Sequence, residues 1–158
     1  LCARGIDQHK IYVSPNGVDP EMFDYKKLLS EREILRTNLA VQEKFVFGFS
    51  GTFGLWHGVD VLAYMIPRVI QQNNKAHFLL IGDGPLKQML YDALAREQVL
   101  HCVTFTGMVP SNCVPNYLAM CDAFLCPTQK NPDDTRFFGS PTKLFEYMMA
   151  GKPIIASD

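Results

Sequence analysis

The stretch that decides the fold lies near the end of the chain, where residues 139–157 read Gly-Ser-Pro-Thr-Lys-Leu-Phe-Glu-Tyr-Met-Met-Ala-Gly-Lys-Pro-Ile-Ile-Ala-Ser. Ser140 is a good N-cap, and Pro141 suits the first helical position because its missing N–H removes no hydrogen bond there. Gly151, with Pro153 two residues later, is a helix stop signal. The sequence therefore predicts one short helix from Pro141 to Ala150.

The start of this predicted helix has the features of an anion site. Its unpaired backbone N–H groups carry a partial positive charge of roughly half an elementary charge. Thr142 and Lys143 add a hydroxyl and an ammonium in the first turn, and Glu146 falls on the same helix face. A carboxylate can accept both hydrogens of a vicinal diol, so a phosphate and a diol held side by side indicate a nucleotide. On composition alone, an exposed helix glutamate is the more common interpretation of Glu146.

The order and spacing of residues 140–148 and 150–157 resemble the donor-binding segment of the retaining glycosyltransferases of the two-domain GT-B fold (family 4). The resemblance implies that the chain binds a nucleoside diphosphate sugar and that Glu146 holds the ribose. In this segment it places the donor contacts at Gly139, Ser140, Pro141, Thr142, Lys143, Leu144 and Glu146.

The beginning of the chain is similar to the family's entry into its C-terminal domain. Ile11–Ser14 is a short apolar run before the turn signal Pro-Asn-Gly at residues 15–17, and it predicts a strand. The resemblance implies that residues 1–158 form a single nucleotide-sugar-binding domain, truncated at both ends. It also implies that an acceptor-binding N-terminal domain is absent from this sequence.

Composition sets the broad class of protein. The chain has 158 residues, 47% of them apolar, and a net charge of −1, as expected for one ordinary globular domain. Nothing in this balance predicts nucleic acid or an anionic membrane as the main partner. No apolar run approaches the roughly 20 residues that span a bilayer. The five cysteines form no metal-type pair, so we expect buried reduced thiols at Cys102, Cys121 and Cys126, and no metal site.

Strand and helix patterns alternate along the rest of the chain, which predicts an α/β fold with a doubly wound parallel sheet. Continuous apolar runs, typical of strands buried on both faces, lie at Phe45–Ser50, His77–Ile81, Val103–Thr106, Ala123–Cys126 and Pro153–Ser157. Helical patterns lie at Lys26–Leu39, Val59–Val69, Leu86–Leu94 and Val114–Met120. We expect Pro67 to kink or shorten the second of these helices.

The loops that follow these strands carry the remaining motifs, because ligands of such sheets gather at the carboxyl ends of the strands. The loop that begins with Gly51 and Thr52 and runs to His57 faces the donor phosphates in relatives. Thr52 stands where the family commonly has an arginine, and His57 where it commonly has a lysine. Neither side chain carries a full positive charge at neutral pH. We therefore expect Lys143 to supply part of the missing charge.

Two further loops border the predicted cleft. Gly82-Asp83-Gly84 lacks the third glycine of a dinucleotide fingerprint, so it is interpreted as a tight turn with Pro85 at the first helical position. In relatives this loop lines the donor cleft. The resemblance also implies that Met108 and Val109 hold the nucleobase through backbone groups, which leaves the choice of base open.

The sequence departs from the family pattern at a third position. Phe138 stands where relatives have a glutamate associated with the donor sugar. Asp133 and Asp134 could take its place, although a solvated loop charge is the simpler interpretation. Trp56 could stack on a ligand or could simply pack.

The leading interpretation is therefore the donor-binding domain of a retaining glycosyltransferase that uses no metal ion and no cofactor besides the nucleotide sugar. The intact enzyme would be cytoplasmic, or peripheral at the inner membrane face, and this chain alone would not turn over. A non-catalytic nucleotide-sugar-binding module is the alternative, favoured by the three departures. A flavodoxin-like signalling domain would need an acidic cluster after Ser50, which the sequence lacks.

Overall fold

The computed structural model describes residues 1–129 and 142–157. Its centre is a parallel sheet with the strand order β3-β2-β1-β4-β5. The strands are β1 (Phe45–Ser50), β2 (Ala76–Ile81), β3 (Val103–Gly107), β4 (Ala123–Cys126) and β5 (Ile154–Ala156). This arrangement confirms the predicted doubly wound α/β fold.

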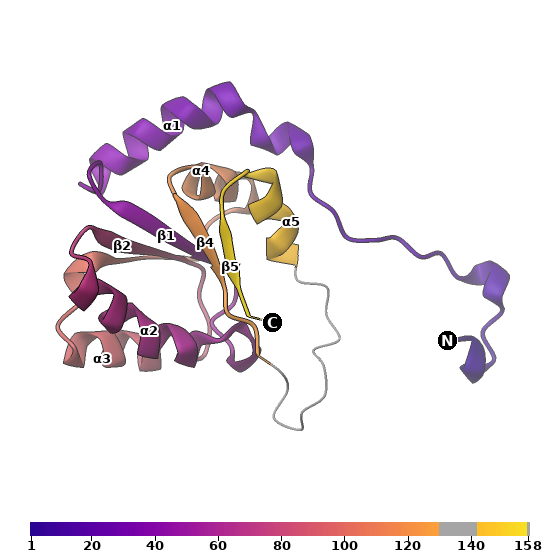
Figure 1. Cartoon of the computed structure of the whole chain (residues 1–158). Helices are drawn as coiled ribbons and strands as arrows, with labels where there is room; N and C mark the ends of the chain where they lie inside the picture. The colour runs from indigo at the N-terminus through magenta and orange to yellow at the C-terminus, as the bar shows by residue number, and fades with distance from the viewer. Residues whose placement is uncertain (130–141, 158) are drawn as a thin grey trace.

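Helices cover both faces of the sheet (Figure 1). The α-helices are α1 (Tyr25–Asn38), α2 (Val59–Gln72), α3 (Lys87–Arg96), α4 (Val114–Ala119) and α5 (Thr142–Met149). Helices α2 and α3 lie on one face, and α1, α4 and α5 lie on the other (Figure 1). Short 3-10 helices are η1 (Cys2–Arg4), η2 (Gln8–Lys10), η3 (Pro20–Phe23), η4 (Leu55–His57), η5 (Leu100–Cys102) and η6 (Ser111–Cys113).

Each face of the sheet has its own apolar core. One core packs Phe49 and Leu80 of the sheet against Leu62 and Ile66 of α2 and Leu90 of α3. The other core, on the opposite face, includes Cys121, as well as Cys126 at the end of β4. The expected burial of Cys102, Cys121 and Cys126 is confirmed.

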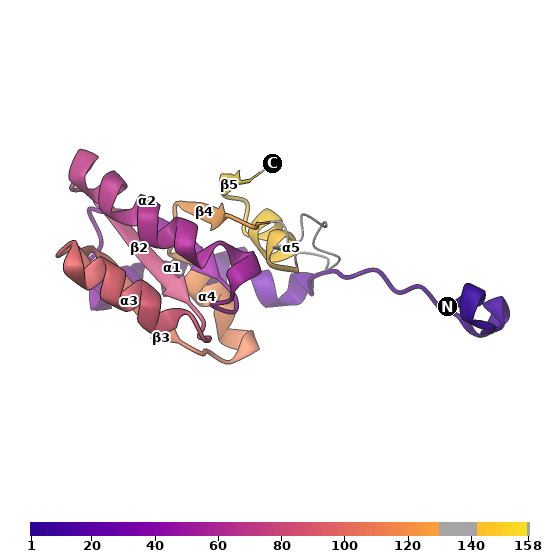
Figure 2. The same cartoon turned by 90° about the horizontal axis from the view of Figure 1, so that it is seen from below.

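Three local predictions were wrong. Residues 11–19 form neither helix nor strand, and Tyr12 and Val13 are almost fully exposed, because no neighbouring strand pairs with this run. The segment before η3 extends away from the body of the fold in both views (Figures 1 and 2). The expected shortening of the second helix is wrong: Pro67 lies inside α2, which continues to Gln72 because the apolar face of the helix remains buried against the sheet. Helix α3 begins at Lys87 rather than at Pro85.

The strand order reverses between β1 and β4, and this reversal positions the candidate site. The chain passes from β1 outward through β2 to β3, then returns to the other side of β1 as β4. The helix after β1 and the helix after β4 therefore lie on opposite faces of the sheet (Figure 1). In open parallel sheets the crevice between two such connections, at the carboxyl ends of the strands, is where ligands bind.

An ionic cluster joins α1 to the amino ends of the central strands. Asp122 accepts hydrogen bonds from Arg32 at 2.6 Å, from Arg36 at 3.0 Å and from the Val46 N–H at 2.8 Å. Burial alone would raise the pKa of Asp122, but these three hydrogen bonds outweigh it and lower that pKa below its usual value. The cluster therefore stabilises the fold most when Asp122 is ionised.

We expect Asp122→Ala to lower the free energy of unfolding by about 3 kcal/mol, because it leaves two guanidinium groups and a backbone amide without their shared acceptor. Urea denaturation at neutral pH measures this loss. Lys87→Ala, which removes only the exposed Asp83–Lys87 ion pair, is the control and should change stability little. The contribution of Asp122 should disappear as the pH falls through its lowered pKa, so an acid-resistant difference between the variants would contradict the assignment.

A second constraint lies at the opposite, carboxyl edge of the sheet, where Gly58 meets the chain leaving β4. Gly58 has a φ of +68°, and a Cβ added to it would lie 1.7 Å from the carbonyl oxygen of Pro127. The Gln129 N–H also donates to the Trp56 carbonyl oxygen at 3.2 Å. The loop after β1 and the segment after β4 are thus packed backbone to backbone.

Gly58→Ala should therefore lower the free energy of unfolding by about 3 kcal/mol, from the left-handed backbone and from the steric clash together. Gly17→Ala is a matched control, because Gly17 has no atom within 4 Å of its added Cβ. Thermal or urea unfolding of the two variants compares them directly. Equal stability of the two variants would show that Gly58 is not a packing glycine.

Candidate functional site

A cavity of about 250 Å³ opens at the carboxyl ends of β1, β2 and β3. It is lined by Ser50, Gly51, Thr52, Ile81, Gly82, Asp83, Met108, Val109 and Val114. Gly51, Thr52, Met108 and Val109 are among the residues singled out from the sequence. The fold brings these four residues together from loops that are more than fifty positions apart in the chain.

Backbone hydrogen bonds fix the loops that form this cavity. The Gly51 N–H donates to the Ile81 carbonyl oxygen at 3.0 Å, and the Gly82 N–H donates to the Gly107 carbonyl oxygen at 3.0 Å. Gly82 has a φ of +127°, and a Cβ added to it would lie 2.1 Å from the Gly51 carbonyl oxygen. The tight turn predicted at residues 82–84 therefore serves close packing against the loop after β1.

Lys143, from the first turn of α5, reaches across to the loop after β1. Its Nζ lies 3.3 Å from His57 Nδ1 and 4.2 Å from the centre of the Phe49 ring. A Cβ added to Gly51 would lie 2.9 Å from the same Nζ, so the missing side chain at Gly51 makes room for the ammonium. Only 6% of Lys143 is exposed. The fold thus unites Gly51, His57 and Lys143 at the reversal of the strand order.

The surroundings of the Lys143–His57 contact lower the pKa of both side chains. Burial lowers the pKa of Lys143 to about 8, and the Glu146 carboxylate opposes part of that change. Burial and the neighbouring Lys143 lower the pKa of His57 to about 4. At neutral pH the imidazole is therefore neutral, and the ammonium carries the positive charge of the pair.

Tyr147 fixes α5 against the sheet. Its hydroxyl accepts a hydrogen bond from the Ser50 N–H at 2.8 Å and donates to the Leu125 carbonyl oxygen at 3.4 Å. Its ring stacks on Phe124, with 4.3 Å between the ring centres. Because Lys143 lies one turn earlier on the same helix face, this anchor also sets the depth of the ammonium.

The other predicted residues of α5 have different surroundings. Thr142 is exposed, and Leu144 is partly buried against the core on its face of the sheet. Glu146 is half-buried; burial raises its pKa, and Lys143 opposes that change. The carboxylate therefore lies one turn from the ammonium, as the helical spacing predicted.

Several residues predicted from the sequence lie in the segment 130–141, which is outside the described residues. Gly139, Ser140 and Pro141 lie outside the described residues, as do Phe138, Asp133 and Asp134. Sequence reasoning missed Tyr147 as an anchor and Val114 as a cavity residue. The strand-to-helix alternation could have pointed to Val114, because it opens the helix that follows β3.

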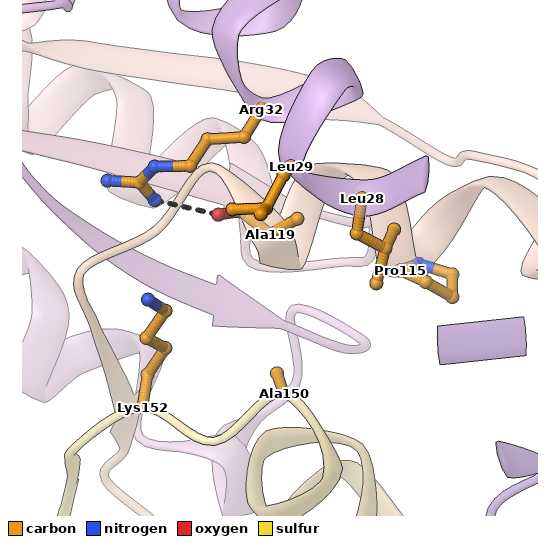
Figure 3. Close-up of a pocket in the computed structure, with 7 residues that line it drawn as sticks. All are labelled: Leu28, Leu29, Arg32, Pro115, Ala119, Ala150 and Lys152. Carbon is orange, nitrogen blue, oxygen red and sulfur yellow. Dashed lines mark hydrogen bonds between the residues drawn. The ribbon is translucent and has the colours of Figure 1, made fainter. Parts of the chain in front are cut away.

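Another cavity lies between α1, α4 and the chain that leads from α5 into β5 (Figure 3). It is lined by Leu28, Leu29, Arg32, Pro115, Ala119, Ala150 and Lys152, and Arg32 donates to the Ala119 carbonyl oxygen at 2.7 Å. Its volume is about 50 Å³. Because Ala119 and Lys152 precede β4 and β5, this cavity lies at the amino edge of the sheet, opposite the candidate site.

Residues 1–129 and 142–157 contain neither a cluster of metal-binding side chains nor a membrane-spanning helix. No group of three or more His, Cys, Asp or Glu side chains is placed to hold a metal ion. None of the helices in that part of the chain is long and apolar enough to cross a membrane.

Comparisons with known proteins agree with this geometry. Residues 44–158 match the family model described as glycosyl transferases group 1. The amylovoran biosynthesis glycosyltransferase AmsK of Erwinia amylovora is 31% identical over 158 residues, which is all of this chain and 36% of AmsK. The chain spans between 35% and 38% of the length of the first curated relatives it matches.

Solved structures share the fold. Anabaena Alr3699/HepE, in complex with UDP and glucose, has a TM-score of 0.72 and 23% identity; the match covers 98% of this chain and 40% of HepE. The C-terminal domain of the group 1 family protein LpcC from Francisella tularensis has a TM-score of 0.68 and 19% identity, over 89% of this chain and 70% of that domain. With more than half of its residues matched by the family model, the chain belongs to the group 1 glycosyl transferases, and its fold is that of their GT-B C-terminal domain.

Proposed function

We propose that the chain binds the nucleoside diphosphate sugar from which a full-length glycosyltransferase transfers its sugar. The observation that carries the proposal is the convergence of Gly51, Thr52, Met108 and Val109 on one cavity, with Lys143 beside Gly51. The nucleobase would lie against Met108 and Val109. The diphosphate would lie towards Gly51, Thr52 and the His57–Lys143 pair.

Glu146 is assigned to the ribose in this proposal. It follows Lys143 on the same helix, so a carboxylate stands one turn beyond the ammonium. A ribose presents two adjacent hydroxyls, and an ionised carboxylate can accept a hydrogen bond from each. Thr142 and Leu144, with Gly139, Ser140 and Pro141 of the same motif, complete the proposed donor segment.

The proposed reaction is transfer of the sugar to an acceptor hydroxyl with retention of the anomeric configuration and without a bound metal. Hydrogen-bond donors and a cation that the fold already holds in position would stabilise the charge that develops on the leaving diphosphate. Lys143 supplies a cation, and the loop after β1 supplies backbone amides. Acceptor binding and the remaining catalytic groups are assigned to a second domain of the intact enzyme, at the cytoplasmic membrane face, so this chain alone should bind but not turn over.

The relatives support this proposal. HepE has been crystallised with UDP and with UDP-glucose, and its fold matches almost all of the present chain. The alternative is a binding module that has lost catalysis, which the neutral side chains at Thr52 and His57 favour. Transfer or hydrolysis of a sugar nucleotide by the full-length protein would eliminate that alternative.

Calorimetric titration with UDP, GDP and ADP tests donor binding, with circular dichroism to verify folding. We expect selective binding of one nucleotide and a loss of about 1.5–3 kcal/mol on Glu146→Ala, because a charged hydrogen-bond acceptor for the ribose is removed. This loss corresponds to an affinity roughly 10- to 150-fold weaker.

The matched control for this prediction is Glu97→Ala, which removes an exposed carboxylate at the end of α3. Its affinity for the same nucleotide should equal that of the wild type. Absence of binding to a folded chain would refute the donor site, and equal losses from both glutamate variants would refute the role of Glu146.

A further inference from the structure

We propose that Lys143 is a positioning residue for His57, which it holds as a neutral Nε2–H donor, and that diphosphate binding is coupled to uptake of a proton at Lys143 Nζ. This inference rests on the proposed function, because it takes a nucleoside diphosphate as the anion. It goes further by assigning one tautomer to His57 and a defined proton to the binding step.

The first observation is that Lys143 is a buried cation without a carboxylate ion-pair partner among the described residues. Lys143 is almost fully buried, and within the ranges that the structure describes no carboxylate forms an ion pair with it. The Nζ atom contacts the face of the Phe49 ring and the Nδ1 atom of His57. A buried ammonium without a counter-ion is unstable relative to one in water, so an arriving anion would stabilise it strongly.

The second observation is the direction of the Lys143–His57 contact. An ammonium has only hydrogen-bond donors, so at 3.3 Å His57 Nδ1 must accept and carries no proton. The proton of the neutral ring is then on Nε2. With Nδ1 accepting from Lys143, the His57 ring can donate a hydrogen bond only through Nε2–H. The ring could then donate to an anion at the carboxyl edge of the sheet while it carries no positive charge.

Among the residues that the structure describes, the titratable groups that face Lys143 come from three elements. They are His57 of η4, Cys126 of β4 and Glu146 of α5 itself. Cys126 is buried and its pKa is raised by that burial, so it stays a neutral thiol. Glu146 opposes the burial of the ammonium from one turn away. A diphosphate would add negative charge much closer than Glu146 does, and so would favour the ammonium over the neutral amine.

The proton balance of the step is simple. Above the lowered pKa of Lys143, the free protein holds mostly the neutral amine. Binding places the diphosphate beside that amine, the amine takes one proton from the buffer, and an ammonium–phosphate ion pair forms. The phosphate already carries its full charge there, since its second pKa is about 6. Proton uptake therefore reports on the protein side chain.

The test is calorimetric titration of the chain with UDP, GDP and ADP at about pH 8.5, in two buffers with different ionisation enthalpies. With a pKa of about 8, only roughly a quarter of Lys143 is charged at that pH, so we expect uptake of roughly 0.5–0.8 proton per nucleotide bound. Between pH 7 and pH 9 the affinity should fall about tenfold.

Lys143→Arg is the matched variant, because a guanidinium stays charged throughout this pH range. It should bind without proton uptake, and its affinity should not change between pH 7 and pH 9. The ring ¹⁵N shifts of His57 in the wild type at about pH 6.5, where Lys143 is an ammonium and His57 is neutral, provide a measurement that needs no folded variant. They should show an unprotonated Nδ1 and a protonated Nε2.

The outcomes separate this inference from the proposed function. Nucleotide binding without proton uptake in the wild type, equal uptake by Lys143→Arg, or a protonated Nδ1 would overturn the inference and leave the donor site standing. Absence of binding to a folded chain at both pH values would overturn both. Uptake by the wild type alone, with Nε2 protonated, would establish the coupling.

Discussion

The hydroxyl of Tyr147 is the interaction on which the geometry of the candidate site depends. It joins the Ser50 amide at the end of β1 to the Leu125 carbonyl in β4, and it does so from α5. A buried hydroxyl that both donates and accepts leaves the helix little freedom to slide, because a shift would leave a buried amide unpaired. The position of Lys143, one helical turn away, follows from this anchor.

The topology of the parallel sheet brings these anchored residues together at one site. Every strand ends at the same edge, and the order reverses between β1 and β4, so the two connections leave the sheet on opposite faces. Glycines let the loops at that edge approach each other: Gly58 abuts the backbone of Pro127, and Gly82 abuts that of Gly51. The amino edge differs, because there the Asp122 carboxylate binds Arg32 and Arg36 and so joins α1 to the starts of β1 and β4.

Much of the fold could be predicted because continuous apolar runs and turn residues are local signals; β1 spans the residues that its apolar pattern indicated. The convergence of the loops that follow the strands could be predicted from the expected sheet topology alone. The burial of Lys143 could not be predicted in the same way, because a lysine in the first turn of a helix is normally solvated. What buries it is a long-range surface made by Phe49, Gly51 and His57. Pro67 failed as a helix breaker for a similar reason, since tertiary packing outweighed local preference.

In the proposed donor site, burial would allow one lysine to act where the family resemblance implies two cations. Exposed ion pairs such as Asp83–Lys87 are screened by water and salt, whereas a charge in a low-dielectric contact interacts more strongly with the next charge to arrive. The cost is that burial removes the ammonium from water, which lowers the pKa of Lys143. Strength of anion binding and ease of deprotonation are therefore two consequences of the same burial, and neither can be altered at Lys143 without altering the other.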